Sequence, residues 1–513
     1  MRLKTKFLGL ETGGKPIVFL NKEDADDLGV RSLGRVRVQQ NKSHLTAIVN
    51  TTTKMIGKNY IGVSEEVKNC LKLKEGSEVE VEIAKFPNSL QFIINKLKGR
   101  KLSYEEIFEI VKDVVEGNLS EIEIASFVTA LYNFGIDLDE STSLSMAMVA
   151  TGEQLKLNKK IIVDKHSCGG VPGDKTTLLV VPIVAAAGLT IPKTSSRAIT
   201  SAAGTADRAE ILMPVNLGIE EMKRVVEKTN GCIVWGGALH LAPADDIFVQ
   251  IEHPLSIDPL LLPSIMSKKK AVGANFLVID IPCGRGTKFK TIGDANLVGK
   301  DFIELGKKLG IKTQCAVTYG EQPIGHTIGT ALEAKEALEV LMRRKNVPDI
   351  IDKATHIANI LLHMVGKDGQ NYALEILKSG KAEKKLREII VEQGGDFEIK
   401  PEDIEIGQFG FDVTAEDSGT ILWINNTGLT EVARAAGAPK DKGAGLYLYK
   451  KLGDPVKKDE KLFTVYADKS RKLERVHKIL EEEDVIGVGD RMEMLIHEIK
   501  EAPVHRKTFI LER

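Results

Sequence analysis

The sequence predicts an α/β protein of several domains: an N-terminal β-rich domain, a helical domain, a large α/β domain with a mixed, mostly parallel sheet, and a C-terminal β-containing region. Three observations predict this architecture. The chain has 513 residues, more than one domain usually contains. The spacing of its apolar residues changes from the period of strands to that of helices near residue 95. From residue 161 onward, short apolar runs bounded by glycines alternate with helical segments, which is typical of parallel strands buried on both faces.

The N-terminal region alternates apolar and charged residues in the manner of half-buried strands. Val36 and Val38 flank an arginine, and Val79 and Val81 flank a glutamate. We therefore predict a β-rich domain over residues 1–85. We expect it to mediate self-association in a homo-oligomer, a dimer or larger, and to contribute no catalytic side chain.

Two capping boxes open the predicted helical region. Ser103 with Glu106, and Ser120 with Glu123, place a hydroxyl three residues before a glutamate, ahead of apolar residues at helical spacing. Both positions therefore predict the start of a helix.

The centre of the chain carries the pattern of the parallel sheet. Its apolar runs are residues 161–163, 232–234, 276–281 and 314–317, and its helical segments include 177–187 and 331–343. The last hundred residues return to short strands, at 419–422 and 445–448. The predicted boundaries are 1–85 for the β-rich domain, 95–160 plus 245–272 for one discontinuous helical domain, 161–244 plus 273–410 for the α/β domain, and 411–513 for the C-terminal region.

Composition and charge exclude several classes of function. The 71 lysines and arginines nearly balance 72 aspartates and glutamates, and only 5% of residues are aromatic, so neither a basic field nor a stacking platform for nucleic acid is expected. The five cysteines form no Cys-x-x-Cys pair, which argues against a disulfide framework or a zinc site. No apolar run is long enough for a membrane span or a signal peptide. We therefore expect a cytoplasmic protein without nucleic-acid or membrane partners.

The first candidate site follows the first predicted strand of the sheet. Residues 164–176 contain three glycines and lead into an apolar helix, a layout in which backbone N–H groups and the helix dipole converge on an anion. Asp174 precedes Lys175 and would place a carboxylate among nucleotide phosphates, so the run is not a P-loop and an ATPase is disfavoured. The alternative is an ordinary turn, but Lys165 and Ser167 add a charge and a hydroxyl that favour phosphate.

A second candidate site, residues 193–207, follows the next strand. Six hydroxyl side chains surround Arg197, and neutral donors combined with one bidentate cation suit phosphate and sugar oxygens. Serine and threonine are also common in loops without function. The position at the carboxyl end of a strand in an α/β sheet nevertheless favours a ligand site.

These two loops resemble the signature regions of the thymidine and pyrimidine nucleoside phosphorylase family. The first carries Lys-His-Ser-Cys-Gly-Gly-Val at 165–171, and the second carries Ser-Ser-Arg at 195–197 and Ala-Gly-Thr-Ala-Asp at 203–207. Pro172 in the glycine turn and the extra N-terminal domain are similar to the archaeal AMP phosphorylases of that family. The resemblance continues through Leu-His-Leu-Ala-Pro-Ala-Asp at 239–245 and covers most of the chain.

The resemblance implies a glycosyltransferase, more narrowly a pentosyltransferase, that needs no metal or organic cofactor. Its reaction would be reversible phosphorolysis of AMP, and of CMP or UMP, by inorganic phosphate to the free base and ribose 1,5-bisphosphate, in nucleotide salvage or degradation. Pyrimidine-specific members carry an arginine where this chain has Ile251, so a pyrimidine substrate has less support. The alternatives are a phosphorylase of unphosphorylated nucleosides and a binding or assembly protein. Because phosphorolysis must exclude water, we expect the cleft between the helical and α/β domains to close on substrate.

The resemblance also assigns roles to single residues. It places phosphate binding at Lys165, Ser167, Ser195 and Thr205. It places the proton donor at Asp258, for which the sequence alone predicts a helix N-cap, a role compatible with the first. It places AMP binding at Gly170, Ser196, Arg197, Ala198, Ile199, Thr200, Ser201, Thr205, Ser264 and Lys288, of which Arg197, Thr200, Ser201 and Lys288 are the available donors for a 5′-phosphate.

Two further residues of the first loop receive no chemical role. His166 has no identifiable acidic partner, and Cys168 shows no sign of activation as a nucleophile. We expect Cys168 to pack beneath the turn.

Overall fold

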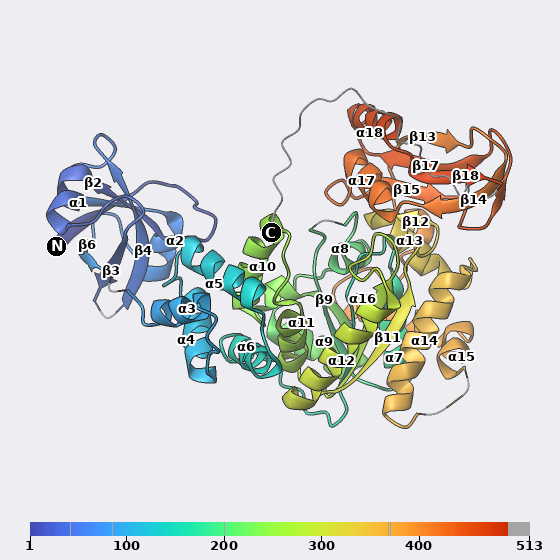
Figure 1. The fold of residues 1–513 in the computed structure, drawn as a ribbon, viewed down its shortest axis with the longest axis horizontal. Helices are drawn as coiled ribbons and strands as arrows, with labels where there is room; N and C mark the ends of the chain where they lie inside the picture. The colour runs from blue at the N-terminus through green and yellow to red at the C-terminus, as the bar shows by residue number, and fades with distance from the viewer. Residues whose placement is uncertain (42, 85, 200, 368, 370, 491–513) are drawn as a thin grey trace, which may run out of the picture.

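The N-terminal region folds into a closed six-stranded barrel, blue in Figure 1, with the strand order β1-β5-β2-β4-β3-β6. The computed structural model describes residues 1–490 apart from 42, 85, 200, 368 and 370. The barrel elements are β1 (Arg2–Phe7), β2 (Ile17–Asn21), α1 (Lys22–Leu28), β3 (Arg35–Gln40), β4 (Ser43–Thr52), β5 (Tyr60–Val63), α2 (Glu65–Leu71) and β6 (Glu78–Ile83). Val36, Val38, Val79 and Val81 are buried in its core, as their alternation predicts.

A helical bundle follows the barrel and is completed by a segment that returns about a hundred residues later. Its helices are α3 (Ser89–Leu97), α4 (Tyr104–Val115), α5 (Glu121–Phe134), α6 (Leu138–Ala150), α10 (Pro243–Leu255) and α11 (Leu261–Ala271). Both predicted capping boxes are formed, at the N-termini of α4 and α5. Phe127 of α5 and Phe248 of α10 lie in one core with ring centroids 6.1 Å apart. Arg35 of the barrel forms an ion pair with Glu123 at the start of α5.

The α/β part is built on five parallel strands in two adjoining pieces. The strands pair in the orders β11-β10-β7 and β8-β9, and one parallel bridge between Ile162 and Thr190 joins the pieces. These strands are β7 (Val163–Ser167), β8 (Ile191–Ser195), β9 (Gly231–Trp235), β10 (Phe276–Cys283) and β11 (Lys312–Tyr319). The helices around them are α7 (Thr176–Ala186), α8 (Thr205–Glu210), α9 (Ile219–Thr229), α12 (Ile292–Leu309), α13 (Thr330–Leu341), α14 (Pro348–Met364), α15 (Tyr372–Lys378) and α16 (Lys381–Glu392), with short 3-10 helices at Gly236–Leu239 and Pro401–Asp403.

Strand β7 corrects one sequence prediction. The apolar run predicts a strand over 161–163 followed by a loop, but the strand extends from Val163 to Ser167. Charged residues usually mark a strand end, yet Asp164 is fully buried here. Its carboxylate accepts a hydrogen bond from the Lys269 ammonium group of α11 at 2.7 Å. A partner distant in sequence therefore lets the strand continue through charged residues.

The C-terminal region consists of two small antiparallel sheets with two helices. It contains β13 (Phe409–Thr414), β14 (Gly419–Ile424), α17 (Asn426–Ala436), β15 (Gly445–Leu448), β16 (Pro455–Val456), β17 (Lys461–Ala467), α18 (Arg471–Glu482) and β18 (Ile486–Gly489). Strand β12 (Thr327–Ile328), which precedes α13, pairs with β15 and ties this region to the α/β part. The barrel and the C-terminal region lie at opposite ends of the molecule, with the α/β part between them (Figure 1). The predicted fold class is thereby confirmed.

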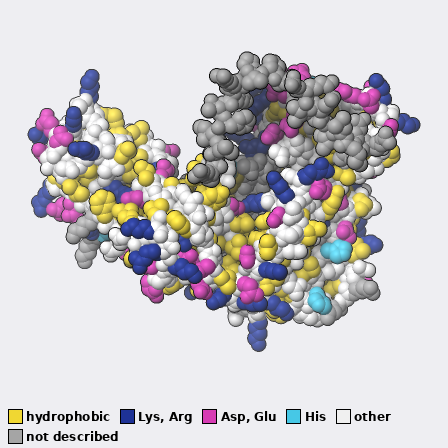
Figure 2. All heavy atoms as spheres, in the orientation of Figure 1, with side chains coloured by type: hydrophobic (Ala, Val, Ile, Leu, Met, Phe, Trp, Pro, Cys, Tyr) yellow, Lys and Arg dark blue, Asp and Glu magenta, His cyan; other side chains and the backbone are white. Residues whose placement is uncertain are grey.

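The surface shows no field of a single sign on the face drawn in Figure 2, where basic and acidic side chains are interspersed. This distribution agrees with the net charge of -1. Within residues 1–490, none of the helices combines the length and the apolar character that a bilayer span requires.

Candidate active site

A cavity of about 190 Å³ opens at the carboxyl edge of the sheet. Ser167, Ser195 and Trp235, the last residues of β7, β8 and β9, all line it. Lys165 and Thr205 line it as well, so the four residues to which the resemblance assigns phosphate lie around one cavity. Ser196 of the predicted AMP-binding set joins them. This edge is where ligands bind in α/β sheets.

Lys165 supplies an unpaired positive charge to this cavity. Its side chain is buried, and no acceptor in the described part of the chain lies within hydrogen-bond distance of its ammonium group. The nearby carboxylates of Asp174 and Asp280 are instead bound by Lys353 of α14, at 3.0 and 2.8 Å. Burial lowers the pKa of Lys165, while Asp174 and Asp280 oppose that shift. A buried, unpaired ammonium group favours an incoming anion.

The cavity hydroxyls are also free to bind a ligand. The Ser195 Oγ atom is buried and has no hydrogen-bond partner among the described residues. The Ser167 Oγ atom accepts a hydrogen bond from the Gly169 N–H group at 3.4 Å, which leaves its own proton available. Buried polar atoms without partners are rare in native structures, and a ligand is one of the ordinary explanations.

Arg197 does not line this cavity. Its guanidinium group donates to Glu210 at 2.7 and 3.0 Å and to Asp207 at 3.1 Å, and it lies 5.0 Å from the ring centroid of Trp235. The hydrogen bonds with Glu210 are the main cause of its raised pKa. These partners lie ten and thirteen residues further along the chain. The sequence of the loop does not predict that they bind Arg197. In this arrangement Arg197 orients the second loop.

The remainder of the second loop faces the C-terminal region. Arg434 of α17 donates to the carbonyl oxygens of Ile199 and Ser201, at 2.9 and 3.4 Å. The backbone N–H group of Ala198 donates to Asp207 at 2.7 Å. Thr200 lies outside the described residues. Nothing in the sequence marks Arg434 as a neighbour of this loop.

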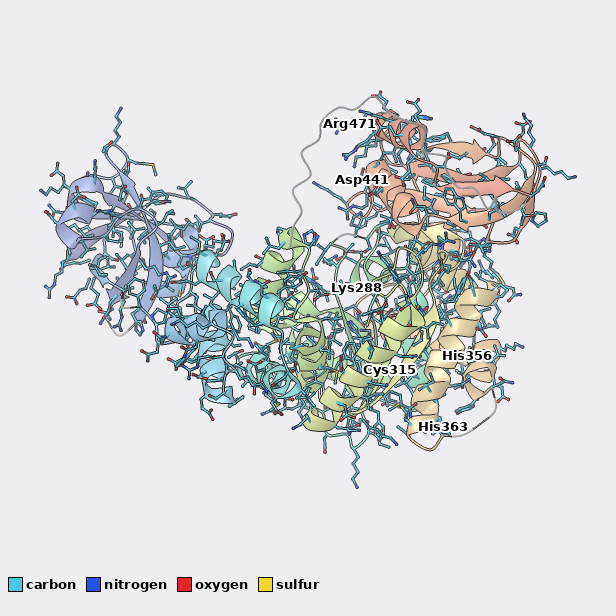
Figure 3. The ribbon with its side chains drawn as sticks, viewed as in Figure 1. Lys288, Cys315, His356, His363, Asp441 and Arg471 are labelled. Atoms are coloured by element: carbon cyan, nitrogen blue, oxygen red, sulfur yellow. The ribbon has the colours of Figure 1, made fainter. Side chains whose placement is uncertain are left out.

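Asp258 and Lys288 form a second group, outside the cavity lining. The Lys288 ammonium group donates to the Asp258 carboxylate at 2.5 Å, across the loops that follow α10 and β10. Lys288 lies near the centre of the molecule in Figure 3. The predicted role of Asp258 as an N-cap is wrong, because α11 begins at Leu261 and Leu260 occupies the capping position. Two turns of chain that are distant in sequence thus bring together the predicted acid and a predicted AMP ligand.

Gly170 brings the first loop next to this group. Its φ of +94° lies in the left-handed region, and a Cβ atom there would lie 2.9 Å from Thr287 Cα and 3.1 Å from the backbone nitrogen of Lys288. Only glycine permits this close approach. Ser264 lies on α11, next to Ile265, which lines the cavity. The four predicted phosphate residues therefore lie at one cavity and Asp258 with Lys288 at an adjoining place, while Arg197, Ile199 and Ser201 lie outside both.

His166 and Cys168 have the properties of residues without an acid or nucleophile role. Burial, with help from Lys269 and Lys193, holds the pKa of His166 well below its ordinary value, so the ring is neutral at neutral pH. Cys168 is buried, and burial raises the pKa of its thiol to about 12. Across the described ranges, no three histidine, cysteine or carboxylate side chains gather as a metal site would require.

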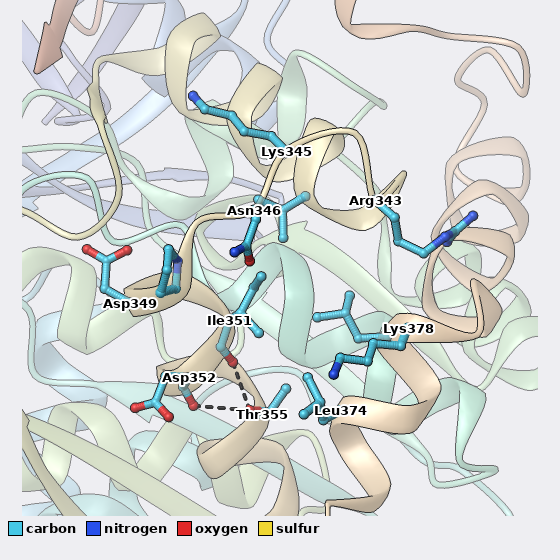
Figure 4. Close-up of a pocket in the computed structure, with 12 residues that line it drawn as sticks. Arg343, Lys345, Asn346, Asp349, Ile351, Asp352, Thr355, Leu374 and Lys378 are labelled. Carbon is cyan, nitrogen blue, oxygen red and sulfur yellow. Dashed lines mark hydrogen bonds between the residues drawn. The ribbon is translucent and has the colours of Figure 1, made fainter. Parts of the chain in front are cut away.

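A wider cavity of about 690 Å³ lies between α13, α14 and α15 and shares no lining residue with the first cavity (Figure 4). Several of its polar side chains already have partners: Thr355 donates to the Ile351 carbonyl oxygen at 2.8 Å, Asp352 contacts His356, and Arg343 pairs with Glu383. These partners leave fewer polar groups for a charged ligand.

Comparisons with known proteins agree with this geometry. Residues 90–152 match the helical bundle domain and residues 159–383 the a/b domain of a glycosyl transferase family, and residues 420–486 match the pyrimidine nucleoside phosphorylase C-terminal domain. The protein named AMP phosphorylase from Thermofilum pendens is 49% identical over the full length of both chains. The AMP phosphorylase from Thermococcus kodakarensis is 49% identical over 93% of this chain and 95% of its own. The chain belongs to the AMP phosphorylase family.

The fold has a structural counterpart outside this family. The anthranilate phosphoribosyltransferase of Thermus thermophilus superposes with a TM-score of 0.51 at 18% identity, over 59% of this chain and 98% of that one. At that identity the likeness concerns the fold alone. The resemblance drawn from the two signature loops is confirmed by the family relatives.

Glu252, near the end of α10, is a buried carboxyl that the sequence pattern does not mark. One of its oxygens accepts a hydrogen bond from the Leu260 N–H group at 3.1 Å, and its backbone carbonyl accepts one from Ile257 at 3.2 Å. These contacts hold both ends of the turn that carries Asp258. Burial, followed by the charge of Asp258, raises the pKa of Glu252 to about 7.

Replacing Glu252 with glutamine is expected to stabilise this family member in alkaline solution. A raised folded-state pKa gives stability that is complete below the ordinary value of 4.5 and is lost as the pH rises through about 7. The variant should therefore match the wild type at about pH 4 and exceed it by about 1–2 kcal/mol at about pH 8, after allowance for solvent screening. Thermal unfolding at both pH values measures this, with the exposed Glu227→Gln as control. An equal difference at the two pH values would contradict the assignment.

Proposed function

We propose that this protein catalyses reversible phosphorolysis of AMP by inorganic phosphate, with adenine and ribose 1,5-bisphosphate as products. The observation that carries the proposal is 49% identity, over the full length of both chains, to a protein named AMP phosphorylase. The unpaired Lys165 ammonium group and the partnerless Ser195 hydroxyl at one cavity support phosphate as a substrate. Incubation of the purified protein with AMP and phosphate should release free adenine, and incubation without phosphate should not.

The proposed residues divide the reaction between the two groups. Lys165, Ser167, Ser195 and Thr205 hold the phosphate, whose oxygen forms a bond to C1′ of the ribose as the bond from C1′ to the adenine nitrogen breaks. The electron pair leaves with adenine, which accepts a proton from Asp258. The proposed AMP-binding residues are the whole set that the resemblance assigns, with Arg197 shaping its loop.

The Asp258–Lys288 ion pair places the proposed proton donor 2.5 Å from a proposed ligand of the 5′-phosphate. When the 5′-phosphate of AMP binds Lys288, the ammonium group exchanges a carboxylate for a phosphate. The Asp258 carboxyl is then released from the ion pair.

AMP is therefore expected to be preferred over adenosine by at least about 100-fold in kcat/KM, because hydrogen bonds to charged groups contribute about 1.5–3 kcal/mol each. Lys288→Met should remove most of this preference without lowering turnover of adenosine. Steady-state kinetics on both substrates measure it, with the neighbouring exposed Lys290→Met as the matched control. Equal kcat/KM for AMP and adenosine in the wild type would contradict the nucleotide specificity.

We also propose that the protein acts in the cytoplasm as a homo-oligomer of two or more chains, in which residues 1–85 form part of the contact. All five cysteines are free, as a reducing compartment favours. Deleting residues 1–85 should lower the number of chains per assembly, calculated from the mass measured by light scattering. AMP turnover per chain should change less than tenfold. An unchanged assembly would contradict this role of the barrel.

A further inference from the structure

Lys193 of β8 is a second lysine at the active-site cavity, and the resemblance of the signature loops gives it no role. It stands two residues before Ser195, as Lys165 stands two residues before Ser167 on β7. Side chains two residues apart in a strand share a face. The parallel bridge between residues 162 and 190 places Lys165 and Lys193 three positions further along each strand. The two strands thus carry the same lysine–x–serine pattern to the same edge of the sheet.

The surroundings of Lys193 differ from those of a structural lysine. It is 4% exposed and lines the cavity, and its ammonium group donates only to the carbonyl oxygen of the adjacent Thr194. Six lysines are buried in the part of the chain that the structure describes. Four of them hold carboxylates: Lys96 with Glu140, Lys175 with Glu336, Lys269 with Asp164, and Lys353 with Asp174 and Asp280.

The two buried lysines that lack a carboxylate within 4 Å, among residues 1–490 as described, are Lys165 and Lys193. Both line the same cavity. Burying an ammonium group without an anion is costly, so a site with two of them is arranged for a ligand with two negative charges.

We propose that Lys193 is a second cationic ligand of inorganic phosphate, which it holds together with Lys165 and Ser195. The inference rests on the proposed function only in taking phosphate as a substrate, because it concerns binding and not turnover. The phosphate dianion then meets two ammonium groups and the partnerless Ser195 hydroxyl.

Proton uptake should accompany this binding. Burial is the main cause that holds the pKa of Lys193 well below its ordinary value, and the neighbouring Lys269 and Lys165 lower it further. An entering dianion reverses that effect and favours the ammonium form. The titratable groups around Lys193 are Asp164, Lys165 and His166 from β7, Asp174 from the glycine turn, Asp246 from α10, and Lys268 and Lys269 from α11.

Calorimetric titration of inorganic phosphate into the free enzyme tests the proposal, in two buffers of equal pH and different heats of ionisation. The wild type should take up protons on binding. Lys193→Met should bind phosphate about 10- to 100-fold more weakly with less uptake. Lys193→Arg, whose guanidinium stays charged, should retain more affinity than the methionine variant but show the same reduced uptake. The exposed Lys159→Met is the matched control and should behave as the wild type.

These variants are expected to fold, because replacing Lys193 leaves no carboxylate within 4 Å unpaired. Lys193→Gln gives a second neutral variant. Unchanged phosphate affinity and proton uptake in both neutral variants would overturn the proposal. Titration of AMP alone separates the two phosphoryl groups: an unchanged AMP affinity supports the inference, while a loss confined to AMP overturns it. A protein that binds phosphate in this way but does not cleave AMP would refute the proposed function and leave Lys193 as a phosphate ligand.

Discussion

Replacing Asp258 with asparagine is expected to lower kcat for AMP phosphorolysis by about 10²- to 10⁴-fold, the usual contribution of a positioned general acid. Asparagine keeps the shape of the side chain but has no acidic proton for the departing adenine. Adenine release at saturating AMP and phosphate measures the loss. KM for phosphate should change little, because Asp258 lies outside the cavity that holds the four phosphate residues.

The protein should remain folded in this variant. The Asp258 side chain is 42% exposed, and its ion pair with Lys288 is exposed enough to contribute little stability. The matched control is Asp139→Asn, an exposed aspartate that also pairs with a lysine, and it should keep full activity. An Asp258→Asn enzyme that retained kcat within tenfold would move the proton donor elsewhere, and Glu252 would be the next carboxyl to test.

Replacing Lys165 with methionine is expected to lower kcat/KM for phosphate by about 10²- to 10³-fold. This is the usual cost of losing one oriented donor in a site that excludes water. The effect should be large because the lysine is buried and its ammonium group is not shared with a carboxylate. Methionine preserves the length of the apolar stem. Initial rates at limiting phosphate measure the effect, with Lys159→Met as the surface control.

If the Lys165→Met variant kept the wild-type rate at limiting phosphate, then the carboxyl edge of β7 would not hold the attacking phosphate. Ser167→Ala and Thr205→Ala should show smaller losses in the same direction, since each removes a neutral donor. A loss of kcat with unchanged KM for phosphate in all three variants would instead indicate an effect on the transition state alone.

The parts of this fold that sequence predicts are those with local causes. The boxes at Ser103 and Ser120 need only a neighbour three residues away, and the alternation around Val36 needs only a pleated strand. The extent of β7 could not be predicted in the same way, because Asp164 becomes tolerable in a strand only after α11 brings Lys269 to it.

In the candidate site too, contacts between neighbours in the sequence can be predicted, and contacts between distant elements cannot. The gathering of Lys165, Ser167, Ser195 and Thr205 at one cavity could be predicted from the two signature loops, because each loop is contiguous in the chain. The partners of Arg197, the buried state of Glu252 and the pairing of Asp258 with Lys288 arise when separate elements meet. Closure of a cleft between the helical and α/β parts stays a prediction, since it concerns a second arrangement of the chain.

The contact of Arg434 with the second loop limits how this protein can be shortened. All the side chains of the phosphate cavity are carried by residues before 411, so a version of the chain ending there would retain every donor described for the nucleophile. It would nevertheless lack the two hydrogen bonds from α17 that hold the backbone at Ile199 and Ser201. The C-terminal region is thus a structural support of the second loop, and an enzyme engineered to a smaller size would need substitutes both for that arginine and for the strand that pairs with β12.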